Sequence, residues 1–249
     1  MGIIKDSVRL LAGASAHYSV RLATTAEDLR AAQTLRFQVF NLELKEGLPE
    51  SHATGLDADA FDPVCDHLLV EHLPTRLVVG TYRLQTGTAA QKNLGYYSAQ
   101  EFDFQPFEPF RAQIVELGRA CVEKQHRNLV VLGKLWKGIA DYATDRGSRY
   151  LIGCSSLTSQ NSAEGAGAYE QLKKYLPQPA WRTFPLPAFA CPLDQKAEVT
   201  IPKLLRAYLT VGAKICGPPA LDRQFGTIDF LTLLDIESIA PETRARFLS

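Results

Sequence analysis

Apolar and polar residues alternate with a period of two in several short stretches, which predicts β-strands. Strands are predicted at residues 18–23, 66–71, 77–84, 113–122, 150–154 and 230–234. The turn residues Pro74 and Thr75 separate the second and third of these strands, so the two are expected to form a hairpin. Most of the strands are too apolar to lie at a surface, which indicates a central sheet.

Longer stretches carry apolar residues at helical spacing. Helices are predicted at residues 25–44, 130–146, 162–176 and 201–211, with shorter helical turns near 99–102 and at 241–247. Thr25 and Asp28 have the spacing of a capping box, Gly147 ends the second helix, and Pro202 lies in the first turn of the fourth. Helices and strands mix along the chain without a repeat or linker, which predicts one α/β domain with a mixed sheet over residues 17–249. Residues 1–16 are expected to be a separate amphipathic segment, packed on the domain or touching a membrane surface.

Two stretches have an unusual composition. The loop at residues 45–64 is long for a compact domain and acidic, which is typical either of a lid or binding segment or of a solvated loop. Its acidic residues are Glu46, Glu50, Asp57, Asp59 and Asp62. The stretch 102–110 contains four phenylalanines, which suit either the core or a tunnel for an alkyl chain.

The predicted strand at 113–122 is apolar except for Glu116 and Arg119. Charged side chains in a core strand must be paired or used, since an isolated buried charge is costly. Side chains alternate along a regular strand, so these two would point to opposite faces. A β-bulge at Gly118 would shift the alternation by one residue and direct both into one cleft, as is common beside active sites. A plain internal ion pair is the alternative interpretation.

The composition argues against several classes of function. Basic and acidic residues balance, with 27 of each among 249, so no overall charge favours nucleic acid. The five cysteines are odd in number and lack CxxC spacing, and the histidines lack ligand spacing, so we expect no metal and no disulfides. No apolar run approaches the roughly 20 residues that cross a bilayer. These features favour a reducing compartment such as the cytoplasm, with peripheral contact at the inner membrane as an option.

Several motifs, taken in chain order, resemble the GNAT acyltransferases that take acyl chains from acyl carrier protein. The motifs are residues 35–40 (LRFQVF), Asp59 and Asp62, 66–70 (DHLLV), 80–84 (GTYRL) and 116–119 (ELGR). This branch contains acyl-homoserine-lactone synthases, N-acyl amino acid synthases and the ornithine N-acyltransferases of ornithine-lipid synthesis, often labelled hemolysin-like. The tail, with Asp222, Phe225 and Asp229, extends the likeness toward the ornithine-type enzymes. The resemblance implies a GNAT-like, mixed, mostly antiparallel sheet flanked by helices, with a C-terminal extension from about residue 195.

The resemblance also implies a donor. Acetyl-CoA-binding members of the fold cradle the pyrophosphate with a Q/R-x-x-G-x-G/A loop at a helix N-terminus. The equivalent stretch here, residues 125–133 (QHRNLVVLG), lacks the paired small residues, which favours the phosphopantetheine thioester of an acyl carrier protein as donor, with no tightly bound cofactor. Carrier proteins are acidic, so a basic cluster nearby is the expected docking surface, with an ordinary solvated helix face as the alternative. The cluster consists of Lys124, His126, Arg127, Lys134 and Lys137.

N-acylation requires a neutral amine, a polarised thioester carbonyl and a proton acceptor. We expect Glu116 to be the base, with Arg119 as the second catalytic residue. The backbone amides of Ala120, Cys121 and Val122 are expected to hold the oxyanion. The residues expected to bind substrate, or to brace the cleft through ion pairs among themselves and with Glu116 and Arg119, are Arg36, Phe40, Asp59, Asp62 and Arg83.

The leading hypothesis is transfer of a long, 3-hydroxylated fatty acyl chain to the α-amine of an amino acid, with ornithine favoured by the resemblance. Three alternatives stay open. They are an N-acyl amino acid synthase with glycine or another acceptor, an acyl-homoserine-lactone synthase, and a non-catalytic carrier-protein-binding protein. The sequence does not decide between acceptors, because acceptor choice depends on the shape of the pocket.

Overall fold

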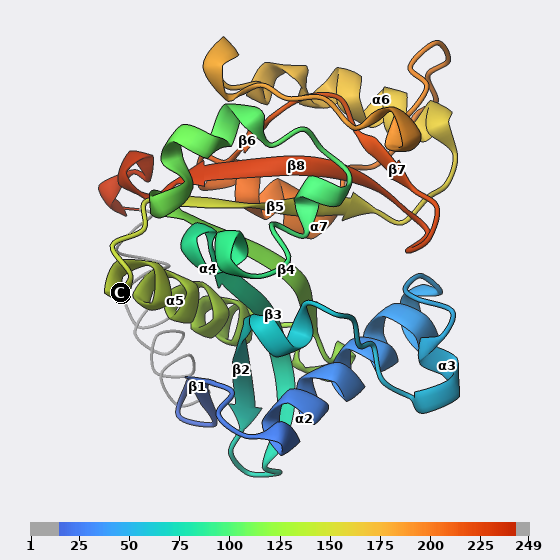
Figure 1. Ribbon diagram of the computed structural model, residues 1–249. Helices are drawn as coiled ribbons and strands as arrows, with labels where there is room; N and C mark the ends of the chain where they lie inside the picture. The colour runs from blue at the N-terminus through green and yellow to red at the C-terminus, as the bar shows by residue number, and fades with distance from the viewer. Residues whose placement is uncertain (1–14, 243–249) are drawn as a thin grey trace, which may run out of the picture.

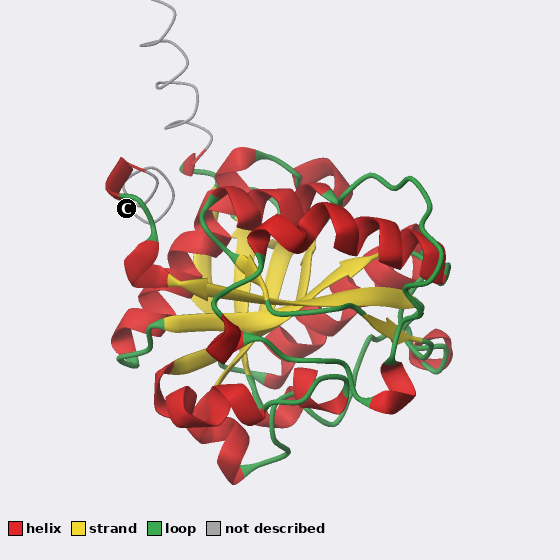
Figure 2. Cartoon of the chain, turned by 90° about the horizontal axis from the view of Figure 1, so that it is seen from above, coloured by secondary structure: helices red, strands yellow, loops and turns green. Residues whose placement is uncertain are grey.

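The computed structural model describes residues 15–242, which contain one eight-stranded sheet covered by helices on both faces (Figures 1 and 2). The strands are β1 (Tyr18–Leu22), β2 (Asp66–His72), β3 (Leu77–Thr86), β4 (Ile114–Val122), β5 (Tyr150–Leu157), β6 (Lys214–Ile215), β7 (Ala220–Asp222) and β8 (Thr227–Asp235). The α-helices are α2 (Ala26–Phe37), α3 (Ser51–Thr54), α4 (Gly87–Lys92), α5 (Leu129–Asp145), α6 (Ser162–Leu172) and α7 (Lys203–Thr210). The expected mixed α/β fold with a mostly antiparallel sheet is confirmed. The predicted segment at 1–16 lies almost wholly outside the described residues, as does most of the helical turn at 241–247.

The sheet is antiparallel except at its centre. Its order is β1-β2-β3-β4-β5-β8-β6, with β7 also paired to β8. Strands β4 and β5 are parallel and pair over only three positions, from Ile114 opposite Tyr150 to Glu116 opposite Ile152. In Figure 1 the two strands run in clearly different directions, with β2, β3 and β4 on one side of the fork and β5 and β8 on the other. The centre of the sheet is therefore open beyond Glu116.

The predicted hairpin and most other elements are confirmed, with some differences at their ends. Helix α2 continues into a π-helix at Gln38–Leu44, as the prediction of one helix to 44 required. The Thr25 hydroxyl accepts from the Asp28 amide at 3.1 Å, so half of the capping box is formed. The expected helix near 99–102 is only a 3-10 turn, Ser98–Gln100. Helix α4 and strands β6 and β7 were not predicted. The expected C-terminal extension is built into the sheet, because β8 pairs with β5 along its whole length.

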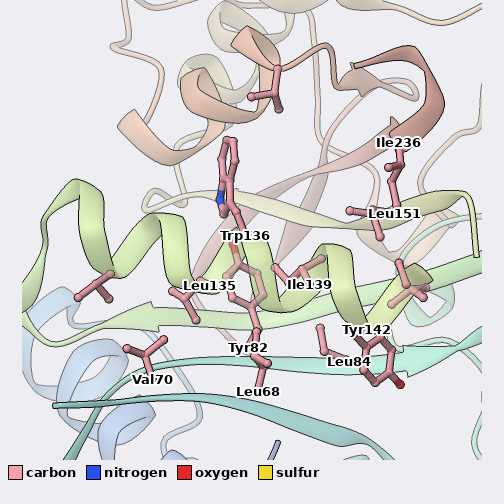
Figure 3. Close-up of a cluster of buried hydrophobic side chains, with 14 of the residues drawn as sticks. Leu68, Val70, Tyr82, Leu84, Leu135, Trp136, Ile139, Tyr142, Leu151 and Ile236 are labelled. Carbon is pink, nitrogen blue, oxygen red and sulfur yellow. The ribbon is translucent and has the colours of Figure 1, made fainter. Parts of the chain in front are cut away.

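Helix α5 packs on one face of the sheet through the apolar stripe expected from the sequence. Val131, Leu135, Ile139 and Tyr142 are all buried there against side chains of β2 and β3. Figure 3 shows Leu135, Ile139 and Tyr142 of the helix directed at Leu68, Val70 and Leu84 of the strands. Burying each such side chain stabilises the fold by roughly 1.5–3 kcal/mol. Within the described residues, no helix combines the length and apolarity needed to cross a bilayer.

Candidate active site

Strand β4 contains the bulge that the sequence predicted. Thr81 lies opposite Cys121 and Arg83 opposite Gly118, so Arg119 and Ala120 together face Tyr82 alone. The left-handed residue of the bulge is Arg119, with φ of 50°, rather than Gly118 itself. A non-glycine residue in this region costs roughly 1–3 kcal/mol, so the rest of the site must hold Arg119 in place.

The bulge brings Glu116 and Arg119 to the same face of the sheet. Both contact Tyr97, since its backbone N–H donates to Glu116 Oε2 at 2.8 Å and its ring lies 5.0 Å from the Arg119 guanidinium carbon. The two charged side chains do not pair with each other, so the alternative of a plain Glu116–Arg119 ion pair is wrong.

Three arginines and three aspartates form a buried ion network beside the bulge. Arg119 contacts Asp57 at 3.3 Å and Asp59 at 3.0 Å, through Nε and Nη2. The other contacts are Arg36 with Asp57 at 2.8 Å and Asp62 at 2.6 Å, and Arg83 with Asp59 at 2.6 Å and Asp62 at 2.9 Å. The formal charges cancel. The network fastens the acidic loop, and with it Arg119, to α2 and β3.

The alternative interpretation of the acidic loop as solvated is wrong at three positions. The side chains of Asp57 and Asp62 are each 1% exposed, and that of Asp59 is 15% exposed. Burial works against ionisation of Asp62, but Arg36 and then Arg83 hold its pKa below the ordinary value. Asp57 was not among the predicted site residues. Three arginines need three acidic partners, but the loop also contains Glu46 and Glu50, so the sequence does not single out Asp57.

Glu116 lies outside the ion network and accepts three hydrogen bonds. Its Oε2 accepts from Gln85 Nε2 at 2.6 Å and from Tyr97 N at 2.8 Å, and its Oε1 accepts from Ser98 N at 2.8 Å. The predicted pairing of Glu116 with the arginines is therefore wrong. A carboxylate offers about four acceptor positions, so one position on Oε1 remains for a further donor. The carboxylate is held in a fixed orientation at the wall of a cavity.

A cavity of about 340 Å³ occupies the gap between β4 and β5. Gly153 lies at the fork, where a Cβ atom would stand 2.1 Å from the carbonyl oxygen of Leu117, so only glycine permits this approach. Of the predicted site residues, Phe40, Arg83, Glu116, Arg119 and Ala120 line the cavity. Arg36, Asp59 and Asp62 do not line the cavity. They belong to the ion network that holds Arg83 and Arg119 in the cavity wall.

One half of the cavity is apolar. Its walls come from α5, α7 and the segment that follows β8. Trp136, Ile139, Leu205, Tyr208, Ile236 and Ile239 are among them. Figure 3 shows Trp136 and Ile139 on α5 together with Tyr82, Leu151 and Ile236. The alternative of a tunnel along the phenylalanines of 102–110 is wrong, because Phe102 and Phe107 are in the core around Trp181 and do not line the cavity.

The other half of the cavity is polar and acidic. Tyr97, Ser98, Ser156, Asp222 and Asp229 line it together with Glu46. Asp229 and its neighbour Glu101 were not predicted to belong to the site. Asp229 carries the same signal that identified Glu116, which is a charged residue in an apolar strand. It was missed because the final strand was taken to begin at Phe230, whereas β8 begins at Thr227.

The backbone N–H groups after the bulge point alternately toward β3 and toward the gap between β4 and β5. Glu123 N donates to Val79 O at 2.8 Å, and Cys121 pairs with Thr81 two residues along the same ladder. Hydrogen-bonded pairs alternate in an antiparallel ladder, so the Cys121 amide is directed at Thr81 and the Val122 amide at the gap. Of the three amides expected to hold an oxyanion, the amide of Val122 is therefore directed at the gap, whereas that of Cys121 is used by the sheet.

The basic cluster on and before α5 is only partly available to a partner. Arg127 makes two hydrogen bonds to Glu43, at 2.6 and 2.7 Å, and His126 Nδ1 bonds Tyr18 OH at 2.8 Å. Lys137 Nζ lies 3.5 Å from Asp141. Lys124 and Lys134 form no ion pair with any residue from 15 to 242.

The N-terminus of α5 is closed by its own cap. The side-chain oxygen of Asn128 accepts from Val130 N at 3.0 Å and from Val131 N at 3.1 Å. These amides belong to the group that binds anions at a free helix N-terminus. The position equivalent to the pyrophosphate loop therefore lacks two of its donors.

The thiols near the site are poor nucleophiles. Burial raises the pKa of Cys121 to about 12, and it raises that of Cys154 well above the ordinary value. Within the described chain one group could reach a metal ion, formed by Glu101, Cys154 and Asp229, whose ligand atoms lie within 4.8 Å of one another. A metal would need the Cys154 thiolate, which this burial disfavours.

Comparison with known proteins matches both the sequence and the fold. A family model described as an acetyltransferase (GNAT) domain matches residues 35–137. A protein of Brucella abortus (strain 2308) described as L-ornithine N(alpha)-acyltransferase is 34% identical, over 93% of this chain and 89% of that protein. A protein of Rhizobium meliloti (strain 1021) with the same description is 32% identical, over 92% of this chain and 83% of that protein.

Two solved structures share the fold. They are the AHL synthase LasI, at 14% sequence identity, and FeeM, an N-acyl amino acid synthase from uncultured soil microbes, at 12%. Each has a TM-score of 0.54 and covers 93% of this chain and 94% of its own. At such low identity the likeness concerns the arrangement of the elements.

Proposed function

We propose, since the chain belongs to the L-ornithine N(alpha)-acyltransferase family on the GNAT fold and is an acyltransferase, that it transfers a long fatty acyl chain from acyl carrier protein to the α-amine of ornithine. The resemblance expected from the ordered motifs is confirmed. The observation that carries the proposal is the two-sided cavity, apolar on the α5 and α7 side and acidic on the other, with the bulge of β4 between its halves.

In this proposal the acyl chain lies in the apolar half of the cavity. Trp136, Ile139 and Tyr208 contact its methylene groups, and the thioester carbonyl reaches the gap between β4 and β5. A 3-hydroxyl group on the chain would meet Ser155 and Thr232, which line the cavity and are hydrogen-bonded to each other at 2.8 Å. Burial of apolar chain supplies the binding free energy, at roughly 0.8 kcal/mol per methylene.

Glu116 is the proposed proton acceptor. The α-ammonium of the acceptor loses a proton to the free position on Glu116 Oε1, directly or through a water molecule. The neutral amine attacks the thioester carbon, and the amide of Val122 stabilises the negative oxygen. The carbon–nitrogen bond forms, the carbon–sulfur bond breaks, and the thiolate of phosphopantetheine leaves. The nitrogen loses a second proton as the amide forms, and the thiolate takes up this proton.

Arg119 is a positioning residue in this scheme. Its guanidinium carbon lies 4.4 Å from the centre of the Phe225 ring and 5.0 Å from that of Tyr97, and its nitrogens pair with Asp57 and Asp59. It therefore fixes the bulge and the Tyr97–Ser98 turn that orients Glu116.

The donor is proposed to be a carrier protein because the α5 N-terminus is capped by Asn128 and Lys124 and Lys134 are unpaired within the described residues. A single phosphodiester needs fewer backbone donors than a pyrophosphate. An acidic carrier protein would dock on these lysines, with Arg127 leaving Glu43 to join them.

The experiment supplies purified protein with L-ornithine and either a 3-hydroxyacyl carrier protein or the matching acyl-CoA, and detects acylornithine by mass spectrometry. We expect product from the carrier-protein donor, at least tenfold faster than from acyl-CoA. Lys134→Glu should raise the KM for the carrier protein, whereas Lys173→Glu, on an exposed part of the chain away from α5, should not. Absence of acylornithine with a carrier protein that another acyltransferase accepts would refute the proposed function.

A further inference from the structure

Two carboxyl groups lie buried against each other at the acidic end of the cavity. Asp229 is on β8, opposite Ser156 of β5, and lines the cavity wall. Glu101 follows a 3-10 turn and approaches Asp229 so closely that their ligand atoms lie within 4.8 Å. Asp229 is 4% exposed and Glu101 is 2% exposed. Neither residue takes part in the ion network of the three arginines.

The acidic end has acceptors without donors. Glu101 Oε2 and Asp229 Oδ1 are buried and lack a well-aligned hydrogen-bond donor in the part of the chain described here, although the Ser156 and Thr227 hydroxyls lower the pKa of Asp229. The same holds for Oε2 of Glu46, which also lines the cavity. Glu46 and Asp229 line the cavity, and Glu101 lies behind Asp229. Buried polar atoms are nearly always satisfied, so the unsatisfied oxygens at this end of the cavity indicate a ligand that donates hydrogen bonds.

The charge balance indicates that this ligand is a cation. Asp222 and Glu46 add to the negative charge around Asp229, and none of the ion pairs among the described residues involves Glu46, Glu101, Asp222 or Asp229. Arg119 acts on Glu101 electrostatically and lowers its pKa, but the Arg119 nitrogens already contact Asp57 and Asp59. Several buried carboxyls without a cation are costly, and a bound ammonium group would relieve that cost.

The pKa shifts of the two carboxyls agree with this. Burial and the charges of Asp229 and Asp222 raise the pKa of Glu101 to about 10, and burial raises that of Asp229 to about 6. Burial of the two neighbouring carboxyls therefore favours a proton on the pair over two negative charges. A cation entering the cavity would take the place of that proton.

The position of the pair suits the far end of an extended acceptor. Cys154 lies between the pair and the bulge, because its thiol is within 4.8 Å of the carboxyl oxygens of Asp229 and Glu101. The thiol also lies beside Ser98, whose backbone N–H donates to Glu116 at 2.8 Å. The two nitrogens of a diamino acid joined by five bonds are roughly 6 Å apart when extended.

We propose that Asp229 and Glu101, with Glu46 at the edge, bind the side-chain ammonium of a basic amino acid acceptor while its α-amine lies at the bulge. This inference rests on the proposed function and adds the residues that select a diamino acid. Asp229 and Glu101 are specificity-determining residues in it, and Glu116 keeps the separate role of accepting the α-proton.

The test compares L-ornithine with L-norvaline, which has the same carbon chain without the second amine. We expect the unmodified protein to prefer ornithine in kcat/KM by roughly 30-fold or more, the effect of leaving a buried charged partner unpaired. Asp229→Asn and Glu101→Gln should each reduce that ratio at least tenfold, chiefly through the KM for ornithine. Asp235→Asn is the matched control on the same strand, because Asp235 pairs with Arg149 near the surface and should leave the ratio unchanged.

Each outcome decides a different claim. If the unmodified protein transfers an acyl group to neither acceptor, the proposed function is refuted. Transfer to both with equal kcat/KM would overturn the ammonium site while keeping the acyltransferase, and this result needs no variant to fold. A ratio unchanged in both folded variants would also overturn it. Loss of the ornithine preference on treatment with a chelator would assign the carboxyls to a metal ion instead.

Discussion

Replacing Asp57 with Asn tests whether the buried ion network holds the site together. Asp57 lies between two arginines, 2.8 Å from Arg36 Nε and 3.3 Å from Arg119 Nε, and its side chain is 1% exposed. Asn keeps the shape and one acceptor oxygen but removes the charge, which leaves three buried arginines facing two aspartates.

The expected loss of stability follows from this imbalance of charge. Removing one partner of a buried ion pair destabilises a protein by about 3–5 kcal/mol, because the remaining charge is uncompensated. For a domain of this size each kcal/mol lowers Tm by about 2–4 °C, so the expected decrease is about 6–20 °C. The retained acceptor places the result toward the lower end of that range.

The assay is thermal unfolding followed by circular dichroism, with urea unfolding as a second measurement. Asp141→Asn is the control, since Asp141 and Lys137 form a pair of exposed side chains on one helix at 3.5 Å. Such a pair contributes about 0.3–0.5 kcal/mol, so its loss should lower Tm by no more than about 2 °C. A decrease for Asp57→Asn as small as that of the control would refute the reasoning.

Three further predictions concern the two halves of the cavity. Ala140 lines the apolar half of the cavity, and Ala140→Leu narrows it. The kcat/KM for the longest acyl donors should therefore fall by roughly 5- to 150-fold, while that for a short-chain donor is unchanged. Equal losses for both donors would contradict this. Glu116→Gln should lower kcat by roughly 10²–10⁴-fold with little change in KM, measured by steady-state kinetics, and an unchanged kcat would exclude it as base. The pKa of Glu101, raised to about 10 by burial and then by Asp229 and Asp222, means that the folded state binds more protons than the unfolded chain between about pH 4.5 and 10. Stability should therefore fall as pH rises through that window, and Tm measured at pH 5 and 9 should differ less in Glu101→Gln than in the unmodified protein; equal differences would contradict the assignment.

The sequence predicted the bulge because its signals are local. Alternation identifies the strand, and Glu116 and Arg119 in an apolar stretch cannot both be accommodated without a shift in phase. The helix stripe of α5 was predictable for the same reason, since a 3.6-residue period is visible in one segment.

The partners of the charged residues were less predictable. Asp57 and Asp59 lie two residues apart in an irregular loop, where no periodicity says which side chain turns inward. Glu116 bonds the amides of Tyr97 and Ser98, and backbone donors leave no mark in a sequence. The short strands β6 and β7 form only because β8 offers them an edge, which is a tertiary effect.

The cavity itself was beyond the sequence because its walls come from distant segments. Trp136, Tyr208 and Ile236 belong to three elements that meet only in the folded chain. The phenylalanines at 102–110 had the same apolar character and are in the core instead. Composition does not separate a packed core from the wall of a cavity.

The regiochemistry of the product tests the central claim most directly. Ornithine carrying ¹⁵N at its side-chain nitrogen is incubated with the protein and an acyl carrier protein donor, and the product is fragmented by mass spectrometry. If Asp229 and Glu101 hold the side-chain ammonium while the α-amine lies beside Glu116, the acyl group will be found on the unlabelled α-nitrogen alone. An acyl group on the labelled nitrogen, or no acylornithine from an active donor, would contradict the account.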